Sequence, residues 1–443
     1  MIFSKYFTIQ REYSRIILFF LAVSVTFNQW FYAQSFVRNH QIFKLLTSLF
    51  FWNLIVLLLG FSQKIFTINR HKVSFRTTNL IRSLYWFVFF TFPSIALILL
   101  REGFGYNVVE GIKFCVGILL TIAVIEVLRD DNFYLFTLIL FIYLSEIIFG
   151  VSQLLLGISY STPENFITIG VSNRWWGLDS IWGTFSLSGK NSYGMCVLLC
   201  SIVVLHFAQN TNRVLVKKFL FCTLPFSAIS IYYSHSRTAI ICVGFLIIFQ
   251  LWKIGKKGKI FLTSFLVIIY CTVILLVIKF EILPIWAMDS RSLFARMLQQ
   301  KNILSLIGSN ILIGNGYNSV LSDPNNFIGA RSLVNSSNST LGLSTDNFFL
   351  RRFLETGVLG EISFMLYLLR LRQLSKRSKS SLKRFSIESK FLVSQVFVTL
   401  ILASLSFDFL SNQTNVCLFS LILCYIIKVN ESSESKVIAL KVL

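Results

Sequence analysis

Long apolar runs recur along most of the chain, and short polar or basic segments separate them. A helix needs about 20 mostly apolar residues to cross the hydrocarbon core of a bilayer, and most of these runs are about that long. We predict about twelve membrane-spanning helices, over residues 16–34, 42–62, 81–100, 108–128, 133–158, 191–208, 217–234, 238–252, 260–280, 347–369, 390–407 and 413–428. The pattern therefore predicts an all-α integral membrane protein, with residues 1–443 forming a single polytopic domain.

One long polar segment, residues 281–345, interrupts this pattern between the ninth and tenth predicted spans. The stretch from Ser290 to Leu306 has amphipathic spacing, so the segment is expected to be partly helical. Further along, Gly314-Asn315-Gly316 is typical of a turn. Since the rest of the chain has the composition of a membrane scaffold, chemistry is expected in this segment or at its ends.

The distribution of positive charge orients the predicted bundle. The chain has 41 Lys and Arg against 19 Asp and Glu, a formal net charge of +22. The basic residues concentrate at the N-terminus and in alternate connections, with clusters at residues 64–82, 213–218, 253–259 and 370–390. Because basic loops stay on the cytoplasmic side, both termini are expected in the cytoplasm and residues 281–345 outside it. This outer segment would face the periplasm in a bacterium with two membranes and the extracellular space otherwise.

The same composition argues against several classes of protein. The basic loops are short and divided among helix connections, so binding of nucleic acid is not expected, and anionic membrane lipids are the expected partners of these charges. The eight cysteines all fall inside predicted spans without CxxC spacing, and the four histidines are scattered. No metal site is therefore expected. No internal repeat is visible, which counts against a transporter built from two similar halves.

A few basic residues lie on the outer side, where the charge rule disfavours them. They are Arg174, Lys190, Arg237, Arg291, Arg296, Arg351 and Arg352. A guanidinium group can hold a phosphate or diphosphate through two parallel hydrogen bonds, and lipid headgroups of that kind lie at this depth. The alternative for each of these residues is that it anchors a helix end by extending to the membrane interface.

Four short patterns stand out at the outer ends of the predicted spans. They are Lys190-Asn191-x-x-Gly194, Ser234-x-Ser236-Arg237, Ala295-Arg296 followed by Gly314-x-Gly316, and Asp346-Asn347 followed by Leu354-Glu355-x-Gly357-Val358-Leu359-Gly360. In this order, and with a long outer segment before the tenth span, they resemble the superfamily of O-antigen ligases and polysaccharide polymerases (Wzy/WaaL). The resemblance covers about residues 180–365, and the spans before it match in hydropathy alone.

The resemblance carries an expected chemistry. Enzymes of this superfamily are membrane glycosyltransferases that take a glycan from undecaprenyl diphosphate and need neither metal nor other cofactor. It implies that an acceptor hydroxyl attacks the anomeric carbon while the lipid diphosphate leaves. Arg237 and Arg296 would then bind the diphosphate, and Asp346 would accept the proton as general base. A flippase for the lipid-linked glycan and a chain-length regulator are the partners that such a pathway implies.

The residue at position 346 bears on which branch of the superfamily the chain resembles. Ligases carry histidine where this chain has Asp346, so the resemblance favours a polymerase, with a ligase as the alternative. The chain also departs from the family in having Gln300 where tryptophan usually follows the loop arginine. The competing class is a flippase or another transporter, which would place its cationic residues in a cavity within several spans. Here those residues gather at the outer ends, which favours the enzyme.

Several candidate residues have a structural alternative. Asp346 is also a favoured N-cap residue for the tenth span. Arg291 replaces Arg296 as the loop arginine if the alignment shifts by five residues. Asn191 can cap the sixth span instead of touching substrate. The expected substrate contacts are Arg291, Lys190, Asn191, Arg174 and Arg351.

Overall fold

The computed structural model of the chain describes most of its predicted helical core. The described residues are 15–16, 18–23, 25–26, 54–55, 58, 75–127, 132–156, 181, 183, 190–251, 311–317, 348–374, 383–406 and 413–442. Within these ranges the regular elements are helices, and no strand occurs among them. The predicted all-α fold is confirmed.

The described helices are mostly longer than the average helix of a soluble domain. They are α5 (Phe75–Glu102), α6 (Tyr106–Val127), α7 (Asn132–Leu156), α8 (Lys190–Asn210), α9 (Val214–Tyr233), α10 (Arg237–Leu251), α16 (Phe348–Gln373), α17 (Lys383–Ser406) and α18 (Gln413–Val442). Long runs of Leu, Ile, Val and Phe form these helices because intrahelical hydrogen bonds satisfy the backbone where no water is present.

The described helices coincide with the predicted spans. Five are long and apolar enough to cross a membrane, over residues Thr77–Glu102, Asn107–Ile125, Phe133–Leu155, Asn191–Asn210 and Val214–Tyr233. Shorter apolar helices cover Arg237–Ile247, Lys390–Leu405 and Thr414–Asn430, where short spans were predicted. The count of about twelve spans stays a prediction, because 260–280 and most of 16–34 and 42–62 lie outside the described residues.

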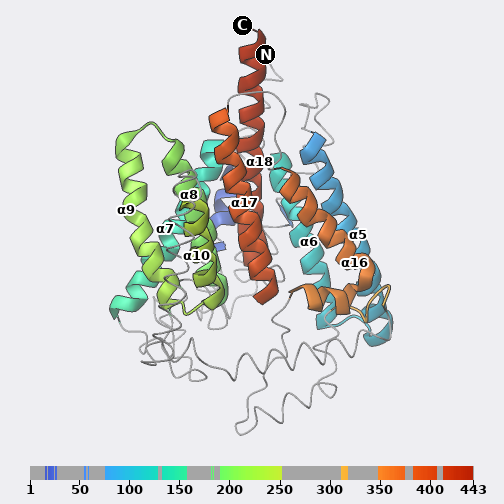
Figure 1. Cartoon of the computed structure of the whole chain (residues 1–443). Coiled ribbons are helices and arrows are strands. Elements are labelled where there is room, and N and C mark those ends of the chain that lie inside the picture. Colours follow the sequence, from blue (N-terminus) through green and yellow to red (C-terminus); the bar gives the residue numbers. More distant parts are fainter. Residues whose placement is uncertain are drawn as a thin grey trace, which may run out of the picture.

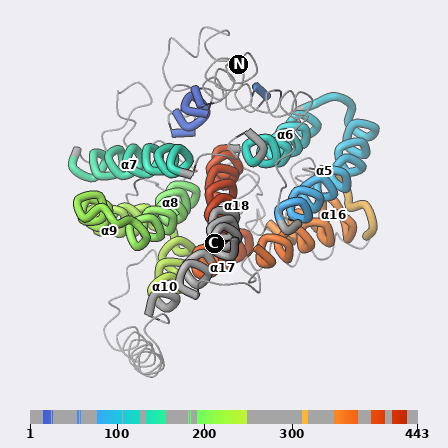
Figure 2. The backbone as a smooth tube through the Cα atoms, turned by 90° about the horizontal axis from the view of Figure 1, so that it is seen from above, coloured from blue at the N-terminus to red at the C-terminus, as the bar shows by residue number. Residues whose placement is uncertain are grey.

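The helices form two groups joined by a central pair (Figures 1 and 2). In the view from above, α18 lies at the centre with α17 beside it. One group contains α7, α8, α9 and α10, and the other contains α5, α6 and α16. The α9–α10 turn, the α5–α6 connection and the start of α16 all lie at the lower end of the bundle in Figure 1. We refer to this end as the lower end.

Burial differs sharply between the two neighbouring helices α8 and α9. Most of α8 is buried, and small side chains such as Gly194, Cys196 and Cys200 let the surrounding helices approach closely. Most of α9 is exposed and presents large apolar side chains, including Phe219 and Phe226, to the outside of the bundle. The exposure of such residues is expected where the surroundings are lipid tails, so α9 is a peripheral helix of the membrane domain.

The central helix α18 is fixed to both groups by polar contacts. The hydroxyls of Thr121 in α6 and Ser420 in α18 are 2.7 Å apart. At the start of α18, Asn415 Nδ2 donates to Ser192 Oγ of α8 over 3.0 Å. Hydrogen bonds of this kind hold helices together in a membrane, where the apolar surface of a helix gains little by leaving lipid. The central helix α18 is therefore joined by hydrogen bonds to one helix of each group.

Candidate functional site

The first part of the site is the tight turn between α9 and α10, which carries the Ser-x-Ser-Arg pattern. Ser234 Oγ donates to the carbonyl of Ile231 over 2.7 Å and accepts from the Ser236 N–H at 3.3 Å. Ser236 Oγ accepts from the Ala239 N–H at 3.4 Å, so Ser236 is the N-cap of α10. His235 between them has a φ of 52°. The turn therefore places Arg237 as the first residue of α10, partly exposed at the lower end.

The start of α8 packs directly against this turn. A Cβ built on Gly194 would lie 2.7 Å from Ser234 Oγ and 2.9 Å from Ser236 Cβ, so only glycine fits there. Asn191, one turn earlier, is half-buried, and α8 begins at Lys190. The structure thus brings the Lys-Asn-x-x-Gly pattern next to the Ser-x-Ser-Arg pattern, as expected if both contribute to one site.

Two described residues that precede α8, Ile181 and Gly183, contact the end of α9 and α7. The Ile181 N–H donates to the carbonyl of Tyr233 over 3.1 Å. The side chain of Gln153 in α7 makes two hydrogen bonds to Gly183, donating to its carbonyl at 2.7 Å and accepting from its N–H at 3.0 Å. Gly183 has a φ of 56°, and a Cβ there would lie 2.2 Å from Glu146 Oε2. Residues 181 and 183 therefore sit between α7 and the α9–α10 turn.

The second part of the site is a break in α16. The sequence predicts a continuous span over 347–369, but Gly357 has a φ of 66° and a ψ of −167°, which interrupts the helix. A Cβ at this position would lie 2.4 Å from the Leu312 carbonyl oxygen. Gly360 lies against Thr356 of its own helix, whereas Gly357 allows a segment from outside the helix to approach.

That segment is residues 311–316, which pair with α16 on both sides of the break. The N–H groups of Asn315 and Gly316 donate to the carbonyls of Leu354 and Glu355 at 2.8 and 3.2 Å. In the opposite direction, the N–H groups of the two residues after Gly357 donate to the carbonyls of residues 311 and 312 at 2.9 and 3.4 Å. A broken helix exposes backbone groups that must find partners away from water. The Gly-Asn-Gly turn supplies them, so two of the predicted patterns form one structural unit.

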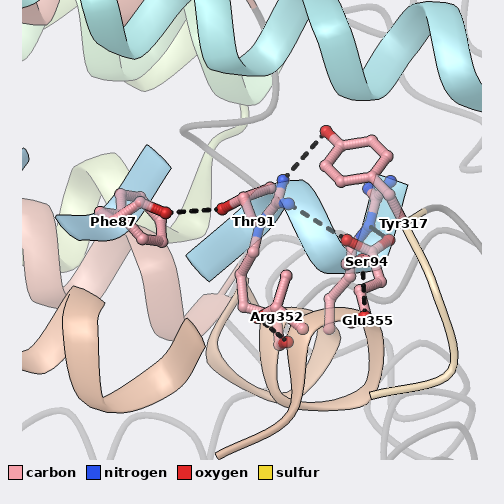
Figure 3. Close-up of polar contacts among 8 residues, drawn as sticks. Phe87, Thr91, Ser94, Tyr317, Arg352 and Glu355 are labelled. Carbon is pink, nitrogen blue, oxygen red and sulfur yellow. Dashed lines mark hydrogen bonds and ion pairs between the residues drawn. The ribbon is translucent and has the colours of Figure 1, made fainter. Parts of the chain in front are cut away.

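The helix α5 closes this unit from the other side. Ser94 Oγ donates to the carbonyl of Glu355 over 2.8 Å, and the Ser94 carbonyl accepts from the Tyr317 N–H at 3.2 Å. Both contacts are visible in Figure 3. The carbonyl of Glu355 therefore has two donors, Gly316 and Ser94, in place of the helical partner that the break removes.

Four side chains form a polar cluster at the break, which we call the α16 cluster: Arg351, Arg352, Glu355 and Tyr317. Figure 3 shows Arg352, Glu355 and Tyr317. Glu355 Oε1 is 2.8 Å from Arg351 Nε, and its Oε2 is 3.2 Å from Arg352 Nη1. Arg352 Nη2 donates to the Tyr317 hydroxyl over 3.2 Å. Burial raises the pKa of Tyr317 to about 12, with the Arg352 charge opposing that shift, so the hydroxyl stays protonated at neutral pH.

Aromatic rings complete the surroundings of the buried arginine. The Arg352 guanidinium carbon lies 3.8 Å from the ring centroid of Phe114 and 5.1 Å from that of Phe348. The side chains of Arg352 and Glu355 have no exposed surface, whereas Arg351 retains 11%. Rings at these distances attract a cation without hydrogen bonds, and the attraction is larger in a dry environment. The cluster is therefore a compact charged centre inside an apolar bundle.

The predicted site residues fall into two sets. Asn191, Arg237 and Arg351 are described and stand in the first turns of α8, α10 and α16, and Arg351 contacts Glu355; their proposed roles stay predictions. Lys190 is described only as the backbone start of α8. The predictions for Asp346, Arg296, Arg291 and Arg174 lie outside the described residues.

Sequence reasoning missed the role of Arg352, Glu355 and Tyr317 as one cluster. Two signals were present in the sequence. Arg352 stands inside an apolar span, where a charged residue is costly unless it is paired, and Glu355 follows it by one helical turn. Tyr317 had no comparable signal, because its contacts with Arg352 and Ser94 join segments far apart in the chain.

Metal binding has no support in the described part of the chain. Among those residues no group of three or more His, Cys, Asp and Glu side chains could hold a metal ion. The described cysteines are free, and all but Cys222 are buried among apolar side chains or in helix contacts. The expectation of a reaction without metal or cofactor stays a prediction.

Together these features define the class of the protein: an all-α membrane protein whose candidate polar site lies at one end of an apolar bundle. Residues 220–365 match the O-antigen ligase family. The match includes both the Ser-x-Ser-Arg turn and the break in α16, and it confirms the resemblance to the Wzy/WaaL superfamily. It does not distinguish the polymerase branch from the ligase branch. No curated protein matches the chain in sequence.

Proposed function

We propose that the protein is a membrane glycosyltransferase that polymerises oligosaccharide repeat units carried on undecaprenyl diphosphate. The observation that carries this proposal is the position of two matched patterns: the starts of α10 and α16 both lie at the lower end of the bundle, and both contain arginine. Basic groups at one end of a membrane domain suit a substrate whose diphosphate lies at the membrane interface. The products would be the long chains of O-antigen, capsule or another exopolysaccharide.

The reaction needs three groups in defined roles. The hydroxyl of one lipid-linked repeat unit attacks the anomeric carbon of the growing chain, and the bond from that carbon to the diphosphate oxygen breaks. The undecaprenyl diphosphate leaves with the electron pair, and Arg237 and Arg296 stabilise its growing negative charge. The proton of the attacking hydroxyl passes to the carboxylate of Asp346, the general base.

Other basic and polar residues hold the substrate in place. Arg291, Lys190, Asn191, Arg174 and Arg351 are the proposed contacts to sugar or phosphate. The start of α8 supports this assignment, because Gly194 packs on the turn that presents Arg237. The lipid-linked glycan would be bound at the outer face of the bacterial cytoplasmic membrane, on the side of the polar segment 281–345. No metal ion or cofactor takes part in this scheme.

A ligase is the second candidate, because the matching family is described as O-antigen ligase. In that case the finished chain is transferred to lipid A core and not to another repeat unit. Asp346 favours the polymerase, since ligases carry histidine at the matching position. Both reactions share the lipid-linked donor, and both imply a flippase that supplies it. A chain-length regulator is an additional partner of the polymerase.

The deciding experiment is the length distribution of glycan in a strain that lacks the protein. A polymerase predicts single repeat units on the cell surface and no long chains, restored by the wild-type gene. Long chains retained on undecaprenyl diphosphate would identify the ligase. Repeat units trapped on the cytoplasmic face would identify a flippase and exclude both enzymes.

A further inference from the structure

The buried arginine of the α16 cluster takes no part in the chemistry described above. Arg352 has no exposed surface, so it cannot contact a substrate without leaving its place. A charged side chain within a membrane bundle is costly and is retained where it has a function. A role in holding other parts of the molecule is consistent with complete burial, whereas substrate binding is not.

Arg352 joins three segments that are distant in the sequence. Its guanidinium lies on the ring of Phe114 in α6, donates to the hydroxyl of Tyr317, and pairs with Glu355 in its own helix. The Tyr317 ring lies 4.8 Å from the same guanidinium carbon. These contacts hold the end of residues 311–317 at the point where their backbone pairs with the break in α16.

The location of this anchor matters for the proposed reaction. Residues 311–317 lie near the middle of the polar segment 281–345, after Arg296 and before Asp346. The contacts of residues 311–317 with α16 and α5 therefore fix one point within this segment. In the sequence, Arg296 precedes that point, and Asp346 follows it, two residues before α16 begins.

We propose that Arg352 is a positioning residue for glycosyl transfer, acting through Tyr317 and Glu355. It holds residues 311–317 on the break in α16 and thereby keeps the loop arginine and the general base at the separation that the reaction needs. This inference rests on the proposed function. Small errors in the placement of reacting groups reduce rates strongly, so loss of the anchor lowers kcat more than it raises KM.

The kinetic test uses full-length protein in membrane vesicles with purified lipid-linked repeat units. Arg352→Met is expected to lower kcat about tenfold to a hundredfold with KM changed by less than about twofold. Tyr317→Phe removes a single hydroxyl and is expected to lower kcat about threefold to tenfold. Arg370→Met, the same change at the far end of α16 where the side chain contacts Gln373, is the matched control. Wild-type kcat in both Arg352→Met and Tyr317→Phe would overturn the proposal.

A second measurement follows the anchor without relying on activity. Leu312 and Leu359 are exposed, and their backbones are joined by the 3.4 Å hydrogen bond across the break. Cysteines at these two positions are expected to be joined quickly by a short thiol cross-linker, and about tenfold more slowly when Arg352→Met is added. Cross-linking the Arg352→Met protein is expected to restore most of its kcat, because the covalent link replaces the anchor.

The two measurements separate the failure of each claim. If Arg352→Met loses activity but cross-links at the wild-type rate, Arg352 does not act by positioning and the inference is wrong. If wild-type protein transfers no glycan while cross-linking still depends on Arg352, the proposed function fails and the anchor itself stands. Slow cross-linking of the Arg352→Met protein, together with a kcat restored by the cross-link, would support both the positioning role of Arg352 and the proposed function.

Discussion

The α9–α10 turn and the α16 cluster hold their arginines in opposite ways. At the turn, Arg237 is partly exposed as the first residue of a helix, and its position is set by two serines that hydrogen-bond the backbone. In the cluster, Arg352 is fully buried against a carboxylate and aromatic rings. Both regions lie at the lower end of the bundle and within the part of the chain that matches the family.

The difference indicates that the α9–α10 turn and the α16 cluster have different roles. An arginine at the surface of a site can exchange water for a diphosphate oxygen, and its charge remains available to the substrate. An arginine that is fully buried against Glu355 and the ring of Phe114 cannot reach a substrate from its place. Its contacts instead fix the backbone around it. The turn is therefore suited to binding, and the cluster to holding the second half of the site in place.

The largest expected effect is that of replacing Asp346, the proposed general base, which stands two residues before α16 begins. If Asp346 is the general base, Asp346→Asn is expected to lower the transfer rate by about a hundredfold to ten-thousandfold. Asparagine caps a helix about as well as aspartate, so a residue that acts as a cap alone would leave the rate unchanged. Single-turnover transfer in vesicles with equal amounts of protein distinguishes these two outcomes.

The next largest effect tests whether the break in α16 is essential to the fold. Gly357→Ala places a Cβ 2.4 Å from the Leu312 carbonyl oxygen at a φ of 66°, and is expected to lower the free energy of unfolding by about 3 kcal/mol. Thermal unfolding in detergent measures this loss. The matched control is Gly244→Ala in α10, where a Cβ would meet nothing within 4 Å. Equal melting temperatures for the two variants would contradict the role of the break.

A smaller effect is expected from the exposed arginine of the turn. Arg237→Ala removes charge-assisted hydrogen bonds worth about 1.5–3 kcal/mol, and is expected to slow polymer formation about tenfold to a hundredfold. The control is Arg213→Ala at the opposite end of α9, where the residue precedes the helix and makes no side-chain cap. Normal glycan chain lengths in a strain with Arg237→Ala, with the protein present at its normal level, would show that Arg237 is not part of the site.

The smallest effect concerns the strain in the turn itself. His235 has a φ of 52°, which costs a non-glycine residue about 1 kcal/mol, so His235→Gly is expected to raise the free energy of unfolding by up to about that amount. The same change within α8, His206→Gly, should destabilise, because glycine weakens a helix and the contact with Tyr425 is lost. The melting temperatures of both variants in detergent are compared with that of the wild-type protein. A lower melting temperature for His235→Gly would show that the side chain, and not the strain, controls the turn.

The sequence predicts the helices and the order of the motifs, because hydropathy and short patterns are local properties. The predicted spans over α5 to α9 coincide with described helices for this reason. The pairing of residues 311–316 with α16 is different, since it depends on hydrogen bonds between segments about forty residues apart. No local pattern shows that Gly357, and not Gly360, adopts a positive φ.

The charged residues show the same limit: the sequence predicts where they stand in the helices but not which distant segments they contact. The outer arginines were predicted from the charge rule, and Arg237 does lie at a helix start at the lower end. The burial of Arg352 depends on Phe114 and Tyr317, whose approach follows from the packing of three helices and a loop. The proposed roles of Asp346 and Arg296 stay predictions, because both residues lie outside the described part of the chain.

The pairing of residues 311–316 with the break in α16 also has an evolutionary consequence. A fixed point in the middle of a polar segment lets the stretches before and after it change in length or sequence independently. An insertion in one stretch leaves the other in register with the helices. The glycines at 314, 316 and 357 must be kept for this, because a Cβ at any of them would lie 2.4 to 2.6 Å from a neighbouring atom. Changing the length of one stretch at a time, with these glycines kept, is accordingly a practical way to find out what each stretch contributes.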